Sequence, residues 1–185
     1  MRSFANGGAR LWHLSPQAKL AFSAYVLFSL LGLITAVLYS LELTGGRGLD
    51  GLRDRYGSAS PVAAATGSGP AIEVDPTDER PLVASVSYRS LLETSHFHLF
   101  TVPVLLLIVS HLFVLAGLST RTTTAGLIGA WGAALAHLAA PWIVHYVSSG
   151  CAVWMPISGA AMLGSIALLC GVTLRRMWWP PAGAA

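Results

Sequence analysis

The sequence predicts an all-α membrane protein in which four transmembrane helices form an antiparallel bundle, with a long external loop between the first two helices. Hydrophobic residues make up 54% of the 185-residue chain and charged residues only 10%, whereas an ordinary soluble domain has about 25% charged residues. The apolar residues gather in four stretches of about 20 residues, which is the length that crosses a bilayer. All eight acidic residues lie between Glu42 and Glu93. These observations exclude a soluble globular protein.

The four apolar stretches divide the chain into nine expected segments. In order, we expect a cytoplasmic lead (1–19), a first span (20–41), an external loop (42–95), a second span (96–118), a cytoplasmic connection (119–124), a third span (125–147), an external turn (148–152), a fourth span (153–174) and a cytoplasmic tail (175–185). The short connections predict that spans two, three and four are antiparallel neighbours. Just before the second span, Val86, Tyr88, Leu91 and Leu92 fit either a short strand or an interfacial helix.

Basic residues give the expected orientation. Outside the acidic segment they lie at the N-terminus, in the second connection and at the C-terminus: Arg2, Arg10, Lys19, Arg121, Arg175 and Arg176. With four spans these three places share one side of the membrane, and enrichment in Lys and Arg marks that side as cytoplasmic. We therefore expect both termini in the cytoplasm and an integral protein of a bacterial inner (plasma) membrane. The net charge of +3 then reflects topology, and nucleic acid is not an expected partner.

Histidine is the residue type that carries the functional prediction. The chain contains no phosphate loop, dinucleotide fingerprint, nucleophile elbow or zinc-protease motif, so the sequence does not decide whether the protein is an enzyme. Five of the six histidines lie within or at the ends of spans two and three: His96, His98, His111, His137 and His145. Ionisable groups inside a membrane are costly and usually mark a functional site. The competing interpretation is that each neutral histidine only hydrogen-bonds a neighbouring helix.

Expected depth in the membrane groups these histidines into two pairs. His98, or alternatively His96, begins span two at the outer face, where His145 ends span three. His111 and His137 lie deeper, with a less close match in depth. Four antiparallel spans with histidine pairs on adjacent helices resemble the small membrane cytochromes of b type, which serve as quinol-reactive or electron-relaying subunits of larger complexes.

This resemblance implies a haem-binding electron-transfer subunit. It implies that His98 or His96 with His145 would ligate one haem b, and that His111 with His137 would ligate a second. The lipid bilayer, other membrane or external subunits and a quinone are the implied partners. A quinone site is compatible with the place where Tyr88, Glu93 and His98 meet the outer interface.

Two alternatives remain open at this point. Glu93, His96, His98 and His145 offer nitrogen and oxygen donors suited to copper or zinc, so they could form a metal site at the outer mouth of the bundle. Otherwise the histidines are structural, and the chain is a non-catalytic accessory subunit that binds partner helices within a membrane complex.

Overall fold

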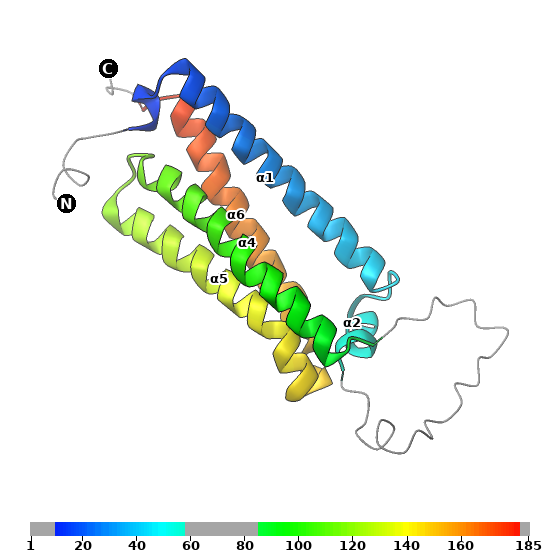
Figure 1. Ribbon diagram of the computed structural model, residues 1–185. Helices are drawn as coiled ribbons and strands as arrows, with labels where there is room; N and C mark the ends of the chain where they lie inside the picture. The colour runs from blue at the N-terminus through cyan, green and yellow to red at the C-terminus, as the bar shows by residue number, and fades with distance from the viewer. Residues whose placement is uncertain (1–9, 58–84, 182–185) are drawn as a thin grey trace, which may run out of the picture.

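The computed structural model describes residues 10–57 and 85–181, and within these ranges the chain contains helices and no strand. The elements in order are η1 (Leu11–His13), α1 (Pro16–Leu43), α2 (Gly48–Tyr56), α4 (Tyr88–Val114), α5 (Thr120–Tyr146), η2 (Ser149–Val153) and α6 (Trp154–Trp178). Figure 1 shows α4, α5 and α6 packed side by side, with α1 leaning against this group. The predicted all-α membrane fold is confirmed.

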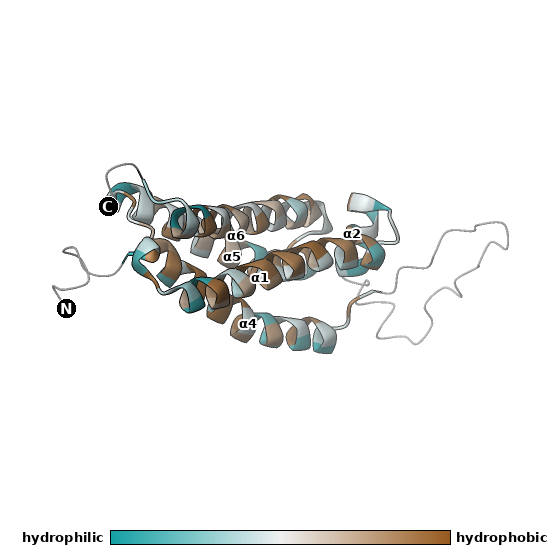
Figure 2. Cartoon of the chain, turned by 90° about the horizontal axis from the view of Figure 1, so that it is seen from above, coloured by the Kyte–Doolittle hydropathy of each residue, from teal (hydrophilic) through white to brown (hydrophobic). Residues whose placement is uncertain are grey.

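Four helical segments are long and apolar enough to span a membrane: Pro16–Leu43, Tyr88–Val114, Thr120–Tyr146 and Ser149–Trp178. Each of them exposes large hydrophobic side chains, such as Leu31, Leu107, Ile128 and Leu168, and Figure 2 colours long parts of these helices as hydrophobic. A helix that is apolar on all sides is suited to lipid rather than to water. The four segments correspond to the four predicted spans, although each helix is longer than its predicted apolar stretch.

The segment before the second span, which was compatible with a strand or a helix, is helical. Helix α4 begins at Tyr88, and Ser87 caps it by accepting a hydrogen bond from the backbone N–H of Ser90 at 3.2 Å. Ser15 and Ser119 cap α1 and α5 in the same way. A serine oxygen at this position satisfies one of the backbone N–H groups that have no partner within the helix. Serine caps therefore fix where three of the spans begin.

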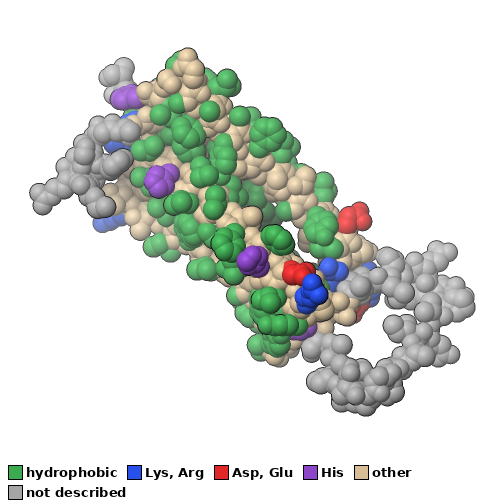
Figure 3. Space-filling view, viewed as in Figure 1, with side chains coloured by type: hydrophobic (Ala, Val, Ile, Leu, Met, Phe, Trp, Pro, Cys, Tyr) green, Lys and Arg blue, Asp and Glu red, His purple; other side chains and the backbone are tan. Residues whose placement is uncertain are grey.

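The two ends of the bundle differ in charge. The described ends of the chain and the α4–α5 connection lie at one end, and α2 and η2 lie at the other (Figure 1). Between these ends the visible face is largely hydrophobic (Figure 3). Described ion pairs, such as Arg53 with Asp50 and Arg89 with Glu93, occur at the α2 end. This arrangement agrees with the predicted alternation of connections, while the assignment of the α2 end to the outside stays a prediction.

Helix α6 organises the core because it packs against α5, α4 and α1. The largest fully buried side chains of this core include Phe113, Leu106, Ile166 and Leu169. Helix α1 packs mainly against α6, and only 11% of its most apolar stretch is buried, compared with 39% for the α6 segment. Most of α1 is therefore left for contact with lipid or with another membrane protein.

The connection between α4 and α5 depends on a glycine. Gly117 has a φ of +69°, a left-handed conformation that is costly for residues with a Cβ. A Cβ atom at this position would lie 2.8 Å from Cη2 of Trp12. Trp12 is held there because the neighbouring Leu11 N–H donates to the Leu115 carbonyl at 3.2 Å. The η1 segment thus closes this end of the bundle.

A short helix covers the other end. Helix α2 packs against η2 and α5, where Leu52 and Tyr56 contact a small buried cluster formed by Ala140, Val144, Ala152 and Met155. The N–H of Val86 donates to the Arg55 carbonyl at 2.7 Å, which joins the start of α4 to α2. Part of the predicted external loop is therefore a structured cap on the bundle.

Candidate functional site

Two tryptophan hydrogen bonds set the register of the histidine-bearing helices. The indole N–H of Trp142 on α5 donates to the Ser95 hydroxyl on α4 at 2.7 Å. Further along the same interface, the indole N–H of Trp131 donates to the Ser110 hydroxyl at 3.2 Å. Because the helices are antiparallel, positions on α4 and α5 can be compared in depth by counting residues from these contacts. The two contacts differ by four residues in register, so each pair of histidines is compared from the contact nearer to it.

This register places His98 and His137 at nearly the same depth. Counted from the Ser95–Trp142 contact, His98 lies three residues further into the bundle on α4, and His137 lies five residues further in on α5. The difference of two residues corresponds to roughly 3 Å along the helix axis. Neither predicted pair contained this combination.

The predicted outer pair is further apart in depth. His145 lies three residues outward from Trp142, whereas His98 lies three residues inward from Ser95. The resulting offset is roughly 9 Å between His145 and His98, and roughly 6 Å between His145 and His96. The His145 Nδ1–H donates to the Tyr56 carbonyl at 3.1 Å. This ring is therefore held against the α2 cap at that end of the bundle.

The predicted deeper pair is not brought together. His111 lies one residue inward from Ser110, and His137 lies six residues outward from Trp131, so the two are separated by roughly 10 Å in depth. His111, like His98, is exposed on the surface of α4, whereas His137 contacts Ser158 of α6. In the register of the Ser110–Trp131 contact, these two histidines are therefore not at the same depth.

The predicted metal ligands at the outer mouth are also dispersed. His96 is exposed beside Phe97 and Phe100, with its ring centroid 5.1 Å from that of Phe100. Glu93 accepts a 3.0 Å hydrogen bond from Arg89 on its own helix. Within residues 10–57 and 85–181, no group of three or more His, Cys, Asp or Glu side chains is arranged to hold a metal ion. The proposed copper or zinc ligand set is therefore not assembled among these residues.

Four of the histidines share one hydrogen-bonding state. The Nδ1–H groups of His98, His111 and His145 donate to the carbonyls of Thr94 (2.8 Å), Leu107 (3.3 Å) and Tyr56 (3.1 Å), respectively. A carbonyl oxygen can only accept, so Nδ1 must carry the proton. The Ser158 hydroxyl donates to the Trp154 carbonyl at 2.6 Å, so it accepts from Nδ1–H of His137 at 3.3 Å. In each ring Nε2 is then the nitrogen with a free lone pair.

Helix α6 shapes the environment of His137. A Cβ atom on Gly159 would lie 3.2 Å from Cε1 of His137, so the absence of a side chain at Gly159 lets the imidazole lie close to α6. Ser158, next to it, supplies the hydroxyl that accepts from this ring. Sequence reasoning missed both residues. In the sequence, Ser158 and Gly159 stand out only as two adjacent small residues in an otherwise apolar helix. Only the packing of α6 against α5 connects these two residues to His137.

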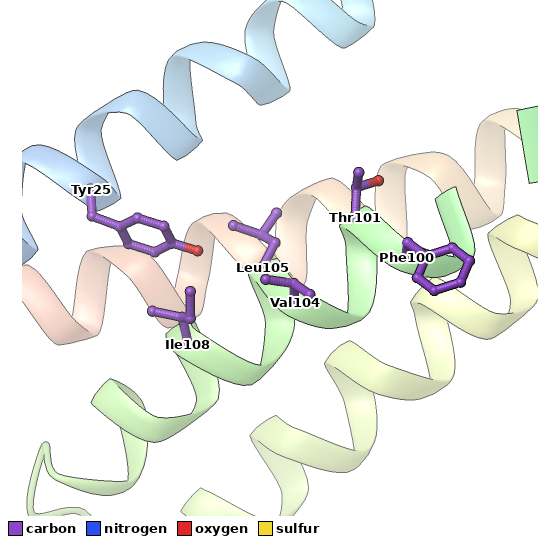
Figure 4. Close-up of a pocket in the computed structure, with 6 residues that line it drawn as sticks. All are labelled: Tyr25, Phe100, Thr101, Val104, Leu105 and Ile108. Atoms are coloured by element: carbon purple, nitrogen blue, oxygen red, sulfur yellow. The ribbon is translucent and has the colours of Figure 1, made fainter. Parts of the chain in front are cut away.

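An apolar groove lies next to the His98 position. It has a volume of about 460 Å³ and runs between α1 and α4 (Figure 4). Its lining residues are Tyr25, Phe100, Thr101, Val104, Leu105 and Ile108. In Figure 4 the hydroxyl of Tyr25 points from α1 toward Leu105 of α4. His98 lies one helical turn outward from Thr101, so the groove extends inward from the level of His98.

Comparison with known proteins identifies a family for this chain. No curated protein and no solved structure matches it. Residues 76–183 match the Aq_1264_TM family, which is described as a transmembrane helical domain. The match covers more than half of the chain and includes α4, α5 and α6 with their five histidines. The chain is therefore an integral membrane protein that belongs to the Aq_1264_TM family of transmembrane helical domains.

Proposed function

We propose that this protein is a haem b-binding subunit of a membrane electron-transfer complex, with His98 and His137 as the axial ligands. The observation that carries the proposal is the match in depth of these two histidines on adjacent antiparallel helices. It replaces both pairs expected from the sequence, since His98 came from one of them and His137 from the other. The proposal therefore contains one haem per chain.

The chemistry of the two rings fits this group. Imidazole is a common axial ligand of haem iron, and the ring nitrogen that does not bind iron usually donates a hydrogen bond to the protein. Here Nδ1–H of His98 donates to Thr94, and Nδ1–H of His137 donates to Ser158. These bonds fix each tautomer and leave Nε2 available. When bound, the haem would supply a one-electron redox centre.

The surrounding residues would determine access to the centre. The stretches of α4 and α5 that carry His98 and His137 are rich in aliphatic side chains, and an apolar shell of this kind would limit the access of water to the group. No acidic residue lies inside α1, α4 or α5 at this depth. The chain would thus hold and orient the group, while electrons would arrive from and leave to partners outside it.

A quinone is the partner that the groove favours. The groove is apolar apart from the hydroxyls of Tyr25 and Thr101, and a long isoprenoid tail needs a surface of this kind. The position expected from the sequence is less suitable, because Tyr88 packs edge-on against Trp142 and Glu93 is paired with Arg89. Quinone access through the α1–α4 groove is therefore part of the proposal.

The visible absorption of the purified protein tests the proposal. Protein produced with an adequate haem supply should show a dithionite-reducible b-type spectrum and one iron per chain. His98→Ala and His137→Ala should each lose this spectrum, because a single remaining ligand holds haem weakly. His96→Ala and His111→Ala are the matched controls, because both rings are exposed on α4 like that of His98 but lie roughly 6 Å and 10 Å from His137 in depth. Both variants should keep the spectrum.

Two outcomes would contradict the assignment. Loss of the spectrum in His145→Ala but not in His137→Ala would favour the pair at the outer mouth. Absence of haem from correctly inserted wild-type protein would favour the second candidate function, a structural accessory subunit. The observation that supports that candidate is that His137 and His145 each hydrogen-bond another helix, through Ser158 of α6 and the Tyr56 carbonyl of α2. Size-exclusion profiles should accompany each variant to show that it is folded.

A further inference from the structure

The end of the bundle opposite α2 carries cations without acidic partners. Its described basic residues are Arg10, Lys19, Arg121, Arg175 and Arg176. The described acidic residues, which are Glu42, Asp50, Asp54 and Glu93, lie toward the α2 end. Among the described residues, ion pairs occur only at the α2 end. An excess of positive charge therefore remains where the chain would meet one membrane surface.

Two of these cations stand where a helix would favour an anion. Lys19 is the fourth residue of α1 and Arg121 is the second residue of α5, and neither helix has an acidic residue in its first turn. The N-terminus of a helix carries a partial positive charge, so a cation there is unfavourable. The helix dipole and the side chains thus add their positive potentials at this end.

Lys19 belongs to a defined contact between α1 and α6. Its Nζ atom lies 5.8 Å from the ring centroid of Trp178. The Trp178 indole N–H donates to the Ser23 hydroxyl of α1 at 2.9 Å. Arg175 precedes Trp178 by three residues on α6, so the two side chains lie on the same part of the helix surface. Lys19, Arg175 and Trp178 therefore converge on one place, which we call the α1–α6 basic site.

The surroundings of this site are those of a lipid headgroup. Tryptophan favours the interface between hydrocarbon and water, and Trp179, beside Trp178, is 70% exposed. Leu20, next to Lys19, is 68% exposed, and Phe28, two turns further along α1, is 74% exposed. A ligand here would meet cations at one end and an apolar helix face along the rest of its length.

We propose that the α1–α6 basic site binds the phosphate of an anionic phospholipid, with the acyl chains lying along the exposed face of α1. A free phosphate would use the cations but not Leu20 or Phe28. A zwitterionic lipid would use the apolar face but would bring its own cation near Lys19 and Arg175. The bound lipid would stabilise the attachment of α1 to α6, which is the main contact of α1 with the rest of the bundle.

Thermal unfolding in detergent provides the test. The full-length protein should gain several degrees in Tm with phosphatidylglycerol or cardiolipin, and little with phosphatidylcholine or inorganic phosphate. Lys19→Gln and Arg175→Gln should each weaken the apparent affinity for the anionic lipid about fivefold, since one cation near the membrane surface contributes about that factor. Arg89→Gln, which removes an exposed cation at the α2 end, should leave the affinity unchanged.

Native mass spectrometry provides a second readout that does not depend on stability. Wild-type protein should retain an anionic lipid that the double variant Lys19→Gln and Arg175→Gln loses, and Lys19→Arg should retain it. Equal stabilisation by anionic and zwitterionic lipids would overturn the proposal. So would an unchanged affinity in the double variant.

Discussion

Trp142 of α5 donates a 2.7 Å hydrogen bond to Ser95 of α4, and this contact aligns His98 with His137. The residues between each histidine and this contact are helical, so a change in register would move the two rings relative to each other. The hydrogen bond therefore determines which histidines can act together, although neither Trp142 nor Ser95 touches the proposed ligand atoms.

Removing this hydrogen bond should loosen the α4–α5 interface. Trp142→Phe keeps an aromatic ring but has no N–H, and hydrogen bonds between membrane helices contribute about 0.6–2 kcal/mol. We expect a loss of stability of that size in equilibrium unfolding. Trp154→Phe is the control because Trp154 is 57% exposed and its indole makes no described hydrogen bond. Equal losses of stability in both variants would show that the smaller ring, and not the lost hydrogen bond, causes the effect.

A side chain at Gly159 should disturb His137. The added Cβ of Gly159→Ala would lie 3.2 Å from Cε1 of the imidazole, so the ring must shift, at a cost of about 1–2 kcal/mol. Gly164→Ala, on the same helix with no atom within 4 Å of the added Cβ, should be neutral or stabilising, because alanine is the better helix former. If Gly159→Ala were no less stable than Gly164→Ala, the proposed close packing would be refuted.

The α4–α5 connection should not tolerate a Cβ. Gly117→Ala would combine a left-handed backbone, which costs about 1–2 kcal/mol, with a contact of 2.8 Å to Trp12. Gly46→Ala serves as a comparison, because Gly46 has a φ of +70° but open space around it. We expect Gly117→Ala to show the larger fall in Tm. Restoration of stability by a smaller residue at Trp12 would identify the contact as the cause of the difference.

The predicted orientation can be tested by cysteine labelling. In a background where Cys151 and Cys170 are replaced by alanine, a cysteine at Asp50 on α2 should react with a membrane-impermeant reagent added from outside. A cysteine at Gln17, beside the start of α1, should react only after the membrane is opened. The reverse pattern would place the termini outside and would reject the assignment based on Lys and Arg.

The sequence by itself determined the class of protein and the number of spans. A bilayer requires about 20 apolar residues for each crossing helix, and this requirement is visible in composition without any tertiary contact. The acidic segment 42–93 and the basic residues elsewhere likewise predicted which connections share an end, because charges avoid hydrocarbon. Serine caps at Ser15, Ser87 and Ser119 are local signals of the same kind.

The tertiary structure decided which histidines are near one another. Span ends read from hydropathy are uncertain by a turn or more, whereas pairing two rings requires a register known to within a residue or two. Side-chain contacts set that register locally, at Ser95 with Trp142 and at Ser110 with Trp131, and the two contacts differ by four residues. The Tyr56 carbonyl that receives Nδ1–H of His145 comes from a residue 89 positions away. No local pattern encodes such a contact, because it exists only once the helices have packed.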